Sequence, residues 1–274
     1  MMENELPEVV LEGTVFVVDV MKDEIREKAN PENIIAFAEM RDAGTHYTIN
    51  YDPVGKNLPG LLQETFLQIN IPTLIMIDPA GMSKKYGKSI QEMEGKTDFE
   101  IIIDQDVLHK RLNAGMLPVI SIVDHPFYVD LRMGSVRPKD DFSTQGILFS
   151  ELDHIGAMKD DESAYLAIYN PITHQLGEID FSSITSLPND LILIELPVPV
   201  RLDPIGYARM HDLPMQRILR GHPPKMEMQA RVADWDEIRL LSTINKNNLV
   251  KQFKEASGES SELKQVKKKK GIRR

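Results

Sequence analysis

The sequence predicts an α+β fold built from two tandem copies of a small, mostly antiparallel β-sheet module with short helices, followed by a disordered basic tail. Three observations support this prediction. Five similar stretches recur in the same order in both halves, β-branched and aromatic runs alternate with turn signals, and the last residues are polar and basic. The predicted boundaries are 1–115 for the first copy, 116–246 for the second copy and 247–274 for the tail.

The similarity between the halves begins with two stretches that align without a gap. "LPEVVLEGTVFVVDV" (6–20) aligns with "LPVISIVDHPFYVDL" (117–131), and most paired positions keep their apolar character. The later pairs are "IAFAEM" with "ILFSEL", "YTINYDP" with "YLAIYNP", "IDPAGMSKKYGKSIQ" with "LDPIGYARMHDLPMQ", and "DQDVLHKRL" with "DWDEIRLLS". Because these blocks keep one order, they indicate an internal duplication.

Each copy opens with two apolar β-runs that a turn signal separates. Gly13 marks the turn in the first copy and residues 124–126 mark it in the second, which predicts a β-hairpin in both. A third short strand is expected around Ile35 and around Ile147.

The middle of each copy is expected to add further strands. The stretch 165–180 predicts a strand, an Asn-Pro turn and a second strand. The apolar runs 73–77 and 191–196 predict a buried strand in each copy. Residues 58–69 fit a helix on their own, but their counterpart 176–188 is more strand-like, so we expect a strand in both.

The pattern becomes helical after the Asp-Pro pair that both copies share. Ser89 with Glu92 three residues later is typical of a capping box. Asp104 or Asp106 is expected to cap the last helix of the first copy, and Gly115 to end it.

The composition is that of a globular protein with an acidic body. Hydrophobic residues make up 42% of the 274 positions, charged residues 27%, and the formal net charge is −10. Basic residues are concentrated in 264–274, so the rest of the chain is more acidic than the total suggests. An acidic body repels phosphate backbones, and nonspecific nucleic-acid binding by the globular part is therefore not expected.

The chain contains no cysteine, which excludes disulfides, thiolate nucleophiles and cysteine-ligated zinc. The N-terminal segment is acidic and has no long apolar core, so no signal peptide is predicted. No apolar run approaches the roughly 20 residues that a membrane helix needs. Together these features predict a cytoplasmic protein that makes no membrane contact.

The charged stretch "FYVDLRMGSVRPKDDF" (127–142) is the strongest candidate for an active site. An aspartate on a strand, with more acidic residues and a lysine nearby, is the kind of set that holds Mg²⁺ and stabilises phosphoryl transfer. One interpretation is therefore a Mg²⁺-dependent nuclease or phosphoesterase. Its catalytic residues would be Asp130, Lys139, Asp140 and Asp141.

Alignment with the first copy divides this charged stretch. Asp130 matches Asp19, Arg137 matches Arg26, and Lys139 matches Lys28. These matches predict a scaffold role, such as strand-end ion pairs or turn contacts. Asp140 and Asp141 have no acidic counterpart and belong to the second copy alone. The plainer interpretation is that they cap a turn, because aspartate is common where the chain leaves regular structure.

Two further patterns favour structural interpretations. "GMSKKYGKS" (81–89) has one residue too many between its glycines for a phosphate loop, so a short helix that ends near Gly87 is expected. His125 and His174 align with no histidine in the other copy, and we expect surface or turn residues at both positions.

We interpret the chain as a non-enzymatic cytoplasmic interaction or adaptor protein. Two similar modules would present paired surfaces to a protein partner and gain avidity when both bind. The tail would add an electrostatic anchor with weak contact to nucleic acid or an acidic surface. No cofactor is expected here, whereas the enzymatic alternative needs Mg²⁺. A third possibility is an accessory protein of a nucleic-acid machine that touches DNA or RNA through the tail.

The candidate binding residues are those particular to the second copy and those of the tail. They are His125, Arg132, Asp140, Asp141, Lys267, Lys268, Lys269, Lys270, Arg273 and Arg274.

Overall fold

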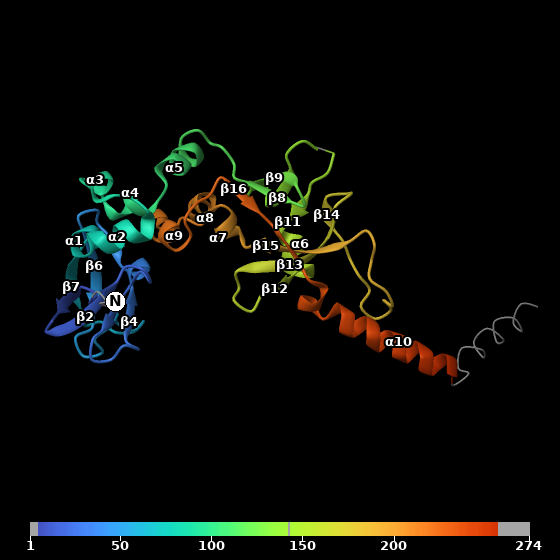
Figure 1. Ribbon diagram of the computed structural model, residues 1–274, viewed down its shortest axis with the longest axis horizontal. Helices are drawn as coiled ribbons and strands as arrows, with labels where there is room; N and C mark the ends of the chain where they lie inside the picture. The colour runs from blue at the N-terminus through green and yellow to red at the C-terminus, as the bar shows by residue number, and fades with distance from the viewer. Residues whose placement is uncertain (1–4, 142, 257–274) are drawn as a thin grey trace, which may run out of the picture. The chain divides into compact units, whose positions relative to one another are not determined.

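The computed structural model describes residues 5–141 and 143–256, and Figure 1 shows how their helices and strands are arranged. The described residues form short helices and mostly antiparallel sheets, which confirms the α+β fold class. They divide into two compact units. Unit 1 consists of the described residues within 5–116 and 203–226, and unit 2 of those within 117–202 and 227–256.

The first sheet of unit 1 is an antiparallel meander in the order β1-β2-β3-β4. Its strands are β1 (Glu8–Leu11), β2 (Thr14–Asp19), β3 (Glu24–Glu27) and β4 (Ile34–Ala36). The hairpin between β1 and β2 turns at Glu12 and Gly13, whose φ angles are both positive (46° and 79°). Two positive φ angles are what a tight hairpin turn requires, so the turn predicted at Gly13 is confirmed.

The second sheet of unit 1 has the order β5-β6-β7 and follows a short 3-10 helix, η1. The bounds are η1 (Phe37–Glu39), β5 (Arg41–Asp42), β6 (His46–Tyr51) and β7 (Leu67–Pro72). Alternate side chains of β6 are buried, as expected for a strand with one face on the core. Tyr47 and Tyr51 thereby join Phe16 and Phe37 in the apolar core of the unit.

The helices of unit 1 come from two separate parts of the chain. They are α1 (Leu74–Ile77), α2 (Pro79–Tyr86), α3 (Ile90–Met93), α4 (Asp98–Ile102), α5 (Gln105–Leu112), α8 (Pro204–Met210) and α9 (Met215–Gly221). The predicted capping box of Ser89 and Glu92 is confirmed at α3, and Asp104 caps α5. Helix α2 ends at Gly87 in a left-handed conformation, as the sequence predicted.

Buried ion pairs connect the segment 203–226, which carries α8 and α9, to the rest of unit 1. Arg111 of α5 donates from Nη2 to Oδ2 of Asp203 at 2.7 Å, and Asp203 also accepts the N–H of Gly206 as the cap of α8. Arg220 of α9 binds both carboxylate oxygens of Asp23, at 2.9 and 3.0 Å. Because little solvent reaches these guanidiniums, breaking either pair would leave a charge without its partner in a poorly hydrated site.

Unit 2 contains two sheets of its own. The first has the order β11-β10-β9-β8-β16, in which β16 is parallel to β8, and the second has the order β12-β13-β15-β17 with β14 beside β13. The strands are β8 (Val119–Ile122), β9 (His125–Asp130), β10 (Ser135–Pro138), β11 (Ile147–Leu148), β12 (Ala157–Met158), β13 (Ala164–Asn170), β14 (Gln175–Leu176), β15 (Ile192–Pro197), β16 (Glu227–Gln229) and β17 (Arg231–Ala233).

The helical segments of unit 2 are α6 (Phe149–Ile155), α7 (Pro199–Leu202), the 3-10 helix η2 (Trp235–Ile238) and α10 (Leu240–Ala256). Helix α10 takes in residues 247–256, which the sequence had assigned to the tail. The remainder of the predicted tail, 257–274, lies outside the described residues. Figure 1 shows the C-terminal part of α10 running away from the sheets of this unit.

Several sequence predictions were wrong in detail. Residues 74–77 form helix α1 instead of a buried strand, and β7 comes directly before them. Residues 58–66 are a loop, although a strand was expected over 58–69. Strands β3 and β10 were not predicted, since both carry charged side chains in a short run. The turn of the second hairpin lies at Val123 and Asp124, one residue earlier than expected.

The two units share part of their element order. A meander comes first in each, followed by a sheet in which β6 pairs with β7 or β13 with β15. Asp78 and Asp203 cap their helices with the same backbone geometry, at φ −139°, ψ 72° and φ −144°, ψ 78°. Residues 203–226 nevertheless belong to unit 1, so the units differ from the predicted domains, and the tandem duplication stays a prediction.

Candidate functional site

The hairpin of β9 and β10 carries most of the charged stretch that the sequence singled out. At the turn of this hairpin, Asp130 accepts the N–H of Met133 at 3.1 Å and lies 3.6 Å from Nε of Arg137. In unit 1, Asp19 accepts the N–H of Lys22 at 3.1 Å and binds Nη2 of Arg26 at 2.7 Å. Asp130 and Arg137 therefore hold a strand-end turn, as the aligned pair does in unit 1.

The opposite end of the same hairpin carries His125, Asp140 and Asp141. The ring of His125, the first residue of β9, stacks on the ring of His174 with centroids 4.0 Å apart and planes 16° apart. Its Nε2 lies 3.1 Å from Oδ1 of Asp140, but forms no hydrogen bond with a described residue. We call His125, His174, Asp140 and Asp141 the histidine cluster.

Two buried aromatic side chains support the histidine cluster. Phe127 lies edge-on to both imidazole rings, at 5.3 Å from His125 and 5.7 Å from His174. The hydroxyl of Tyr169 forms a 2.9 Å hydrogen bond with Nδ1 of His174. A tight turn that follows β13 brings His174 to this place: the side chain of Asn170 accepts backbone N–H groups of the turn, and His174 has a positive φ of 59°.

The charges of the cluster follow from burial and neighbours. The pKa of His174 is lowered, first by burial and then by the nearby His125, while the carboxylates of Asp141 and Asp140 act to raise it. Hydrogen bonds from the hydroxyl and the N–H of Ser143 lower the pKa of Asp141. At neutral pH the cluster therefore combines an uncharged His174 with a negatively charged Asp141.

Unit 1 has an ion pair at Lys56, the residue that the sequence alignment pairs with His174. Lys56 occupies the turn after β6, also with a positive φ (52°), and its Nζ lies 2.6 Å from Oε1 of the buried Glu27. Asn33 donates to the other oxygen of Glu27 at 3.0 Å. Unit 1 therefore joins its turn to the meander through charges, whereas unit 2 uses stacked imidazoles. The alignment of His174 with Lys56 was the sequence signal for this difference. It did not predict that His174 contacts His125.

The structure separates the residues of the predicted metal site. Asp130 and Asp140 lie at opposite ends of the hairpin, about 16 Å apart at the usual rise of a strand. Lys139 is exposed, and its Nζ lies 5.6 Å from the ring centre of Tyr128. Arg132 is exposed in the turn near Asp130. Within 5–141 and 143–256, no three histidine, aspartate or glutamate side chains are arranged to hold a metal ion.

The predicted binding residues of the tail belong to the segment 257–274. Lys267, Lys268, Lys269, Lys270, Arg273 and Arg274 all lie outside the described residues. Of the sequence-predicted binding residues, the structure brings together His125, Asp140 and Asp141, and it leaves Arg132 at the other end of the hairpin.

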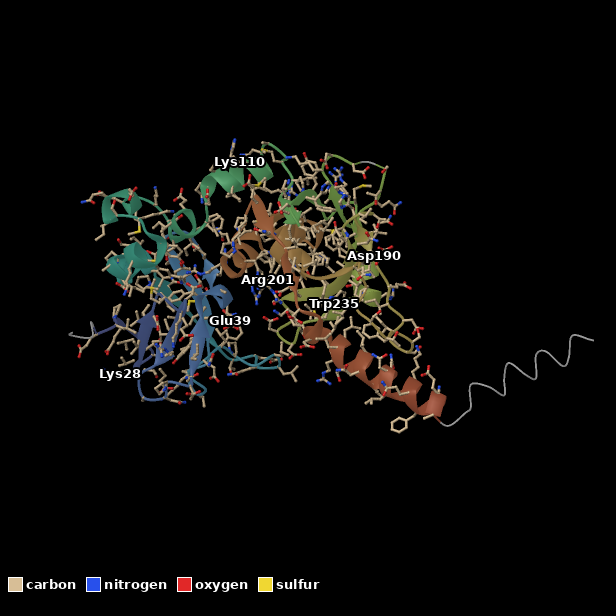
Figure 2. The ribbon with its side chains drawn as sticks, turned by 45° about the vertical axis from the view of Figure 1, so that its right-hand side comes forward. Lys28, Glu39, Lys110, Asp190, Arg201 and Trp235 are labelled. Carbon is tan, nitrogen blue, oxygen red and sulfur yellow. The ribbon has the colours of Figure 1, made fainter. Side chains whose placement is uncertain are left out.

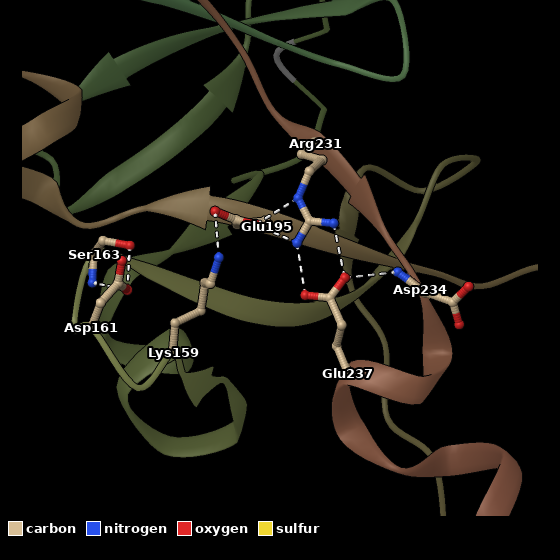
Figure 3. A network of polar contacts seen from close by, with 7 residues as sticks. All are labelled: Lys159, Asp161, Ser163, Glu195, Arg231, Asp234 and Glu237. Atoms are coloured by element: carbon tan, nitrogen blue, oxygen red, sulfur yellow. Dashed lines mark hydrogen bonds and ion pairs between the residues drawn. The ribbon is translucent and has the colours of Figure 1, made fainter.

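A second polar cluster ties together strands and helix in unit 2 (Figure 3). Arg231 donates to both oxygens of Glu237, at 2.8 and 2.7 Å, and to Glu195 at 2.6 Å. Lys159 lies 3.2 Å from the other oxygen of Glu195. These hydrogen bonds, chiefly those from Arg231, lower the pKa of Glu237 to about 2. Glu195 and Glu237 are thus both paired in the folded state.

Large apolar side chains are exposed at many described positions, including a loop of unit 1 and a helix of unit 2. In unit 1 the loop 58–66, between β6 and β7, exposes Leu61 (106%) and Leu62 (96%) completely. In unit 2 the end of α10 exposes Leu249, Val250 and Phe253, the last at 72%. The loop patch and the α10 patch, as we call them, both differ from isolated exposed residues because neighbouring apolar side chains occur together.

The corresponding loop of unit 2, 177–191 between β14 and β15, is held by helix α10. Asn247 donates from Nδ2 to the carbonyls of Phe181 (3.0 Å) and Ile184 (2.8 Å). Asn248 donates to the carbonyl of Thr185 at 3.0 Å. These bonds satisfy backbone acceptors of a long loop with side chains from the middle of a helix.

Comparisons with known proteins found no similarity: no protein-family model matches the chain, and no curated protein or solved structure matches it either. Over the described residues, none of the helices combines the length and apolar character needed to cross a membrane.

Proposed function

We propose that the chain is a non-enzymatic interaction protein of the cytoplasm that binds a protein partner through the loop patch. The observation that carries this proposal is the complete exposure of Leu61 and Leu62 on one loop. Burying a leucine side chain contributes about 1.5–3 kcal/mol. A partner that buries both leucine side chains would therefore gain binding free energy from this contact.

The contrast between the two units supports the same proposal. In unit 2 the loop 177–191 receives Asn247 and Asn248 from a helix, whereas Leu61 and Leu62 stand in water on the corresponding loop of unit 1. A partner helix or strand that covers the loop patch would complete unit 1 in the way that α10 completes unit 2. We further propose that the α10 patch is a second contact, because two linked contacts raise the overall affinity.

The paired state of the acidic side chains supports a non-enzymatic role. Asp130, Glu195 and Glu237 are engaged in ion pairs or turn contacts, so they hold structure. The histidine cluster would serve as a polar contact at the edge of unit 2. The tail, with Lys267 and its basic neighbours, would anchor the protein weakly to an acidic partner surface or to nucleic acid.

The test is capture of partners by the tagged full-length protein from its own cells. We expect the double variant Leu61→Asp/Leu62→Asp to lose specific partners that the wild type retains. Ile172→Asp is the matched control, because Ile172 is also exposed (77%) but lies in a turn of unit 2. Circular dichroism should show that both variants remain folded. The same partners on all three proteins would remove the basis of the proposal.

The enzymatic alternative needs Asp130, Lys139, Asp140 and Asp141 to act together with Mg²⁺. Thermal unfolding with and without Mg²⁺ or Mn²⁺, combined with a phosphodiester turnover assay, tests it directly. A metal-dependent rise in melting temperature together with turnover would favour the enzyme over the interaction protein.

A further inference from the structure

Unit 1 contains a cavity whose lining shares no residue with the loop patch. It has a volume of about 240 Å³, and its walls come from η1, β5, α4 and α9. Its lining combines arginines with apolar side chains, among them Arg41, Arg217, Arg220, Met40, Phe99 and Ile102. We call it the arginine cavity. Guanidiniums beside apolar surface are a combination that suits a small organic anion.

Arg220 gives the cavity a fixed donor group. Its side chain is 7% exposed, and it binds the carboxylate of Asp23 through Nε and Nη2 and the hydroxyl of Tyr47 through Nη1 at 2.7 Å. The guanidinium also lies over the ring of Phe37, 5.4 Å from its centre. Nη1 and Nη2 each carry a second N–H that these contacts do not use, so a positioned guanidinium retains donors for a ligand.

Arg217 and Arg41 add two positive charges to a cavity that Glu39 and Asp42 also line. Both are exposed at the cavity, and neither side chain forms an ion pair or hydrogen bond with the described residues. Arg217 precedes Arg220 by three residues on α9, which places both side chains on the same side of the helix. A bound anion could therefore contact both guanidiniums.

The carboxylates of the cavity are already engaged with the backbone. Glu39, labelled in Figure 2, accepts the N–H of Ala36 at 3.4 Å, and Asp42 accepts the N–H of Gly44 at 2.7 Å. Neither forms an ion pair with Arg41 or with the second exposed arginine of the cavity within the described part of the chain. The N–H groups of Arg41 and Arg217 therefore remain available to an external carboxylate, although the charges of Glu39 and Asp42 oppose its approach.

We propose that the arginine cavity binds a carboxylate group carried on a short apolar stem. The planar fork of a guanidinium matches a carboxylate with two parallel hydrogen bonds. Met40, Phe99 and Ile102 provide apolar surface for the stem. The carboxylate could belong to a free dicarboxylic acid or to the C-terminal residue of a peptide, and both sources have the same chemistry at the site.

The experiment titrates the full-length protein with three probes and follows binding by calorimetry and by the arginine side-chain NMR signals. The probes are glutarate, a short apolar peptide with a free C-terminus, and the same peptide with an amidated C-terminus. We expect saturable binding of glutarate or of the free peptide, and none of the amidated peptide. Which of the two binds more tightly identifies the source of the carboxylate.

The variants Arg217→Gln and Arg41→Gln should each weaken this binding about tenfold, because a charge-assisted hydrogen bond is lost. Arg209→Gln is the matched control: Arg209 is exposed on α8 in the same unit but does not line the cavity. Since all three side chains are exposed, unchanged melting temperatures should accompany the loss of binding.

Three results would overturn the proposal. They are no saturable binding of either carboxylate probe, equal binding of the free and amidated peptides without binding of glutarate, and carboxylate binding that Arg217→Gln and Arg41→Gln leave unchanged. The loop-patch variants should not alter this binding, so the outcome is independent of the partner captured through Leu61 and Leu62.

Discussion

Replacing Asp98 by alanine should destabilise unit 1 strongly. Asp98 is the first residue of α4, is completely buried (0% exposed), and accepts three hydrogen bonds from other elements. The donors are the hydroxyl of Tyr47 at 2.5 Å and the N–H groups of Leu74 (2.5 Å) and Ile75 (3.0 Å). Thr73 supplies no side-chain cap to α1, so Asp98 caps that helix from a distance.

The size of the effect follows from the donors that the variant would leave unpaired. A buried donor without a partner costs about 1–3 kcal/mol. Water entering the space left by the carboxylate would reduce this cost, so we expect Asp98→Ala to lower the free energy of unfolding by about 4 kcal/mol. Asp98→Asn keeps one acceptor oxygen and should lose roughly half as much.

Urea unfolding followed by far-ultraviolet circular dichroism measures this loss. With a slope of about 2 kcal/mol per molar urea, the transition of unit 1 should move down by roughly 2 M. Glu94→Ala is the control, since Glu94 is an exposed acidic residue just before α4. The single tryptophan, Trp235, lies in unit 2 and follows that unit by fluorescence. A shift below about 0.5 M for Asp98→Ala would show that the capping argument is wrong.

Three further predictions concern single groups. Burial lowers the pKa of His174, so the unfolded chain binds a proton at this residue at a higher pH than the folded chain does. The free energy of unfolding should therefore decrease as the pH falls below about 6.5. NMR titration should give a pKa below 6.5 for His174, and a higher value contradicts this. In Gly206→Ala the new Cβ would lie 2.1 Å from Oδ2 of Asp203 and displace the helix cap, so thermal unfolding should show a loss of about 1–2 kcal/mol, whereas Gly221→Ala, with open space around its Cβ, should not. Asp130→Asn should lower the melting temperature and leave partner capture unchanged; lost capture with a normal melting temperature would assign Asp130 to a binding site instead.

Local signals were enough to predict the elements whose cause is local. Gly13 marks a turn that needs a positive φ, and Ser89 with Glu92 satisfies the free N–H groups at a helix start. Asp104 caps α5 in the same way. Each of these depends on residues within a few positions, so the sequence carries the whole explanation.

The elements that the sequence predicted wrongly depend on distant residues. Residues 73–77 are apolar and would suit a buried strand, but Asp98 caps their N–H groups and thereby stabilises the helix α1. Contact between His125 and His174 depends on how a turn of one sheet meets the start of another. Nothing in the spacing of these two histidines indicated that their rings would stack.

Because unit 1 is formed by two separate segments of the chain, it can complete its folding only late in synthesis. Residues 5–116 leave the ribosome long before 203–226, which supply α8, α9 and the Arg220 that binds Asp23. At the usual 5–20 residues per second, the first segment must wait roughly 5–20 s for its missing helices. During that interval Ile103 lacks Ile205 and Leu219, with which it forms an apolar cluster, and Asp23 lacks Arg220, so these contacts can form only late in synthesis.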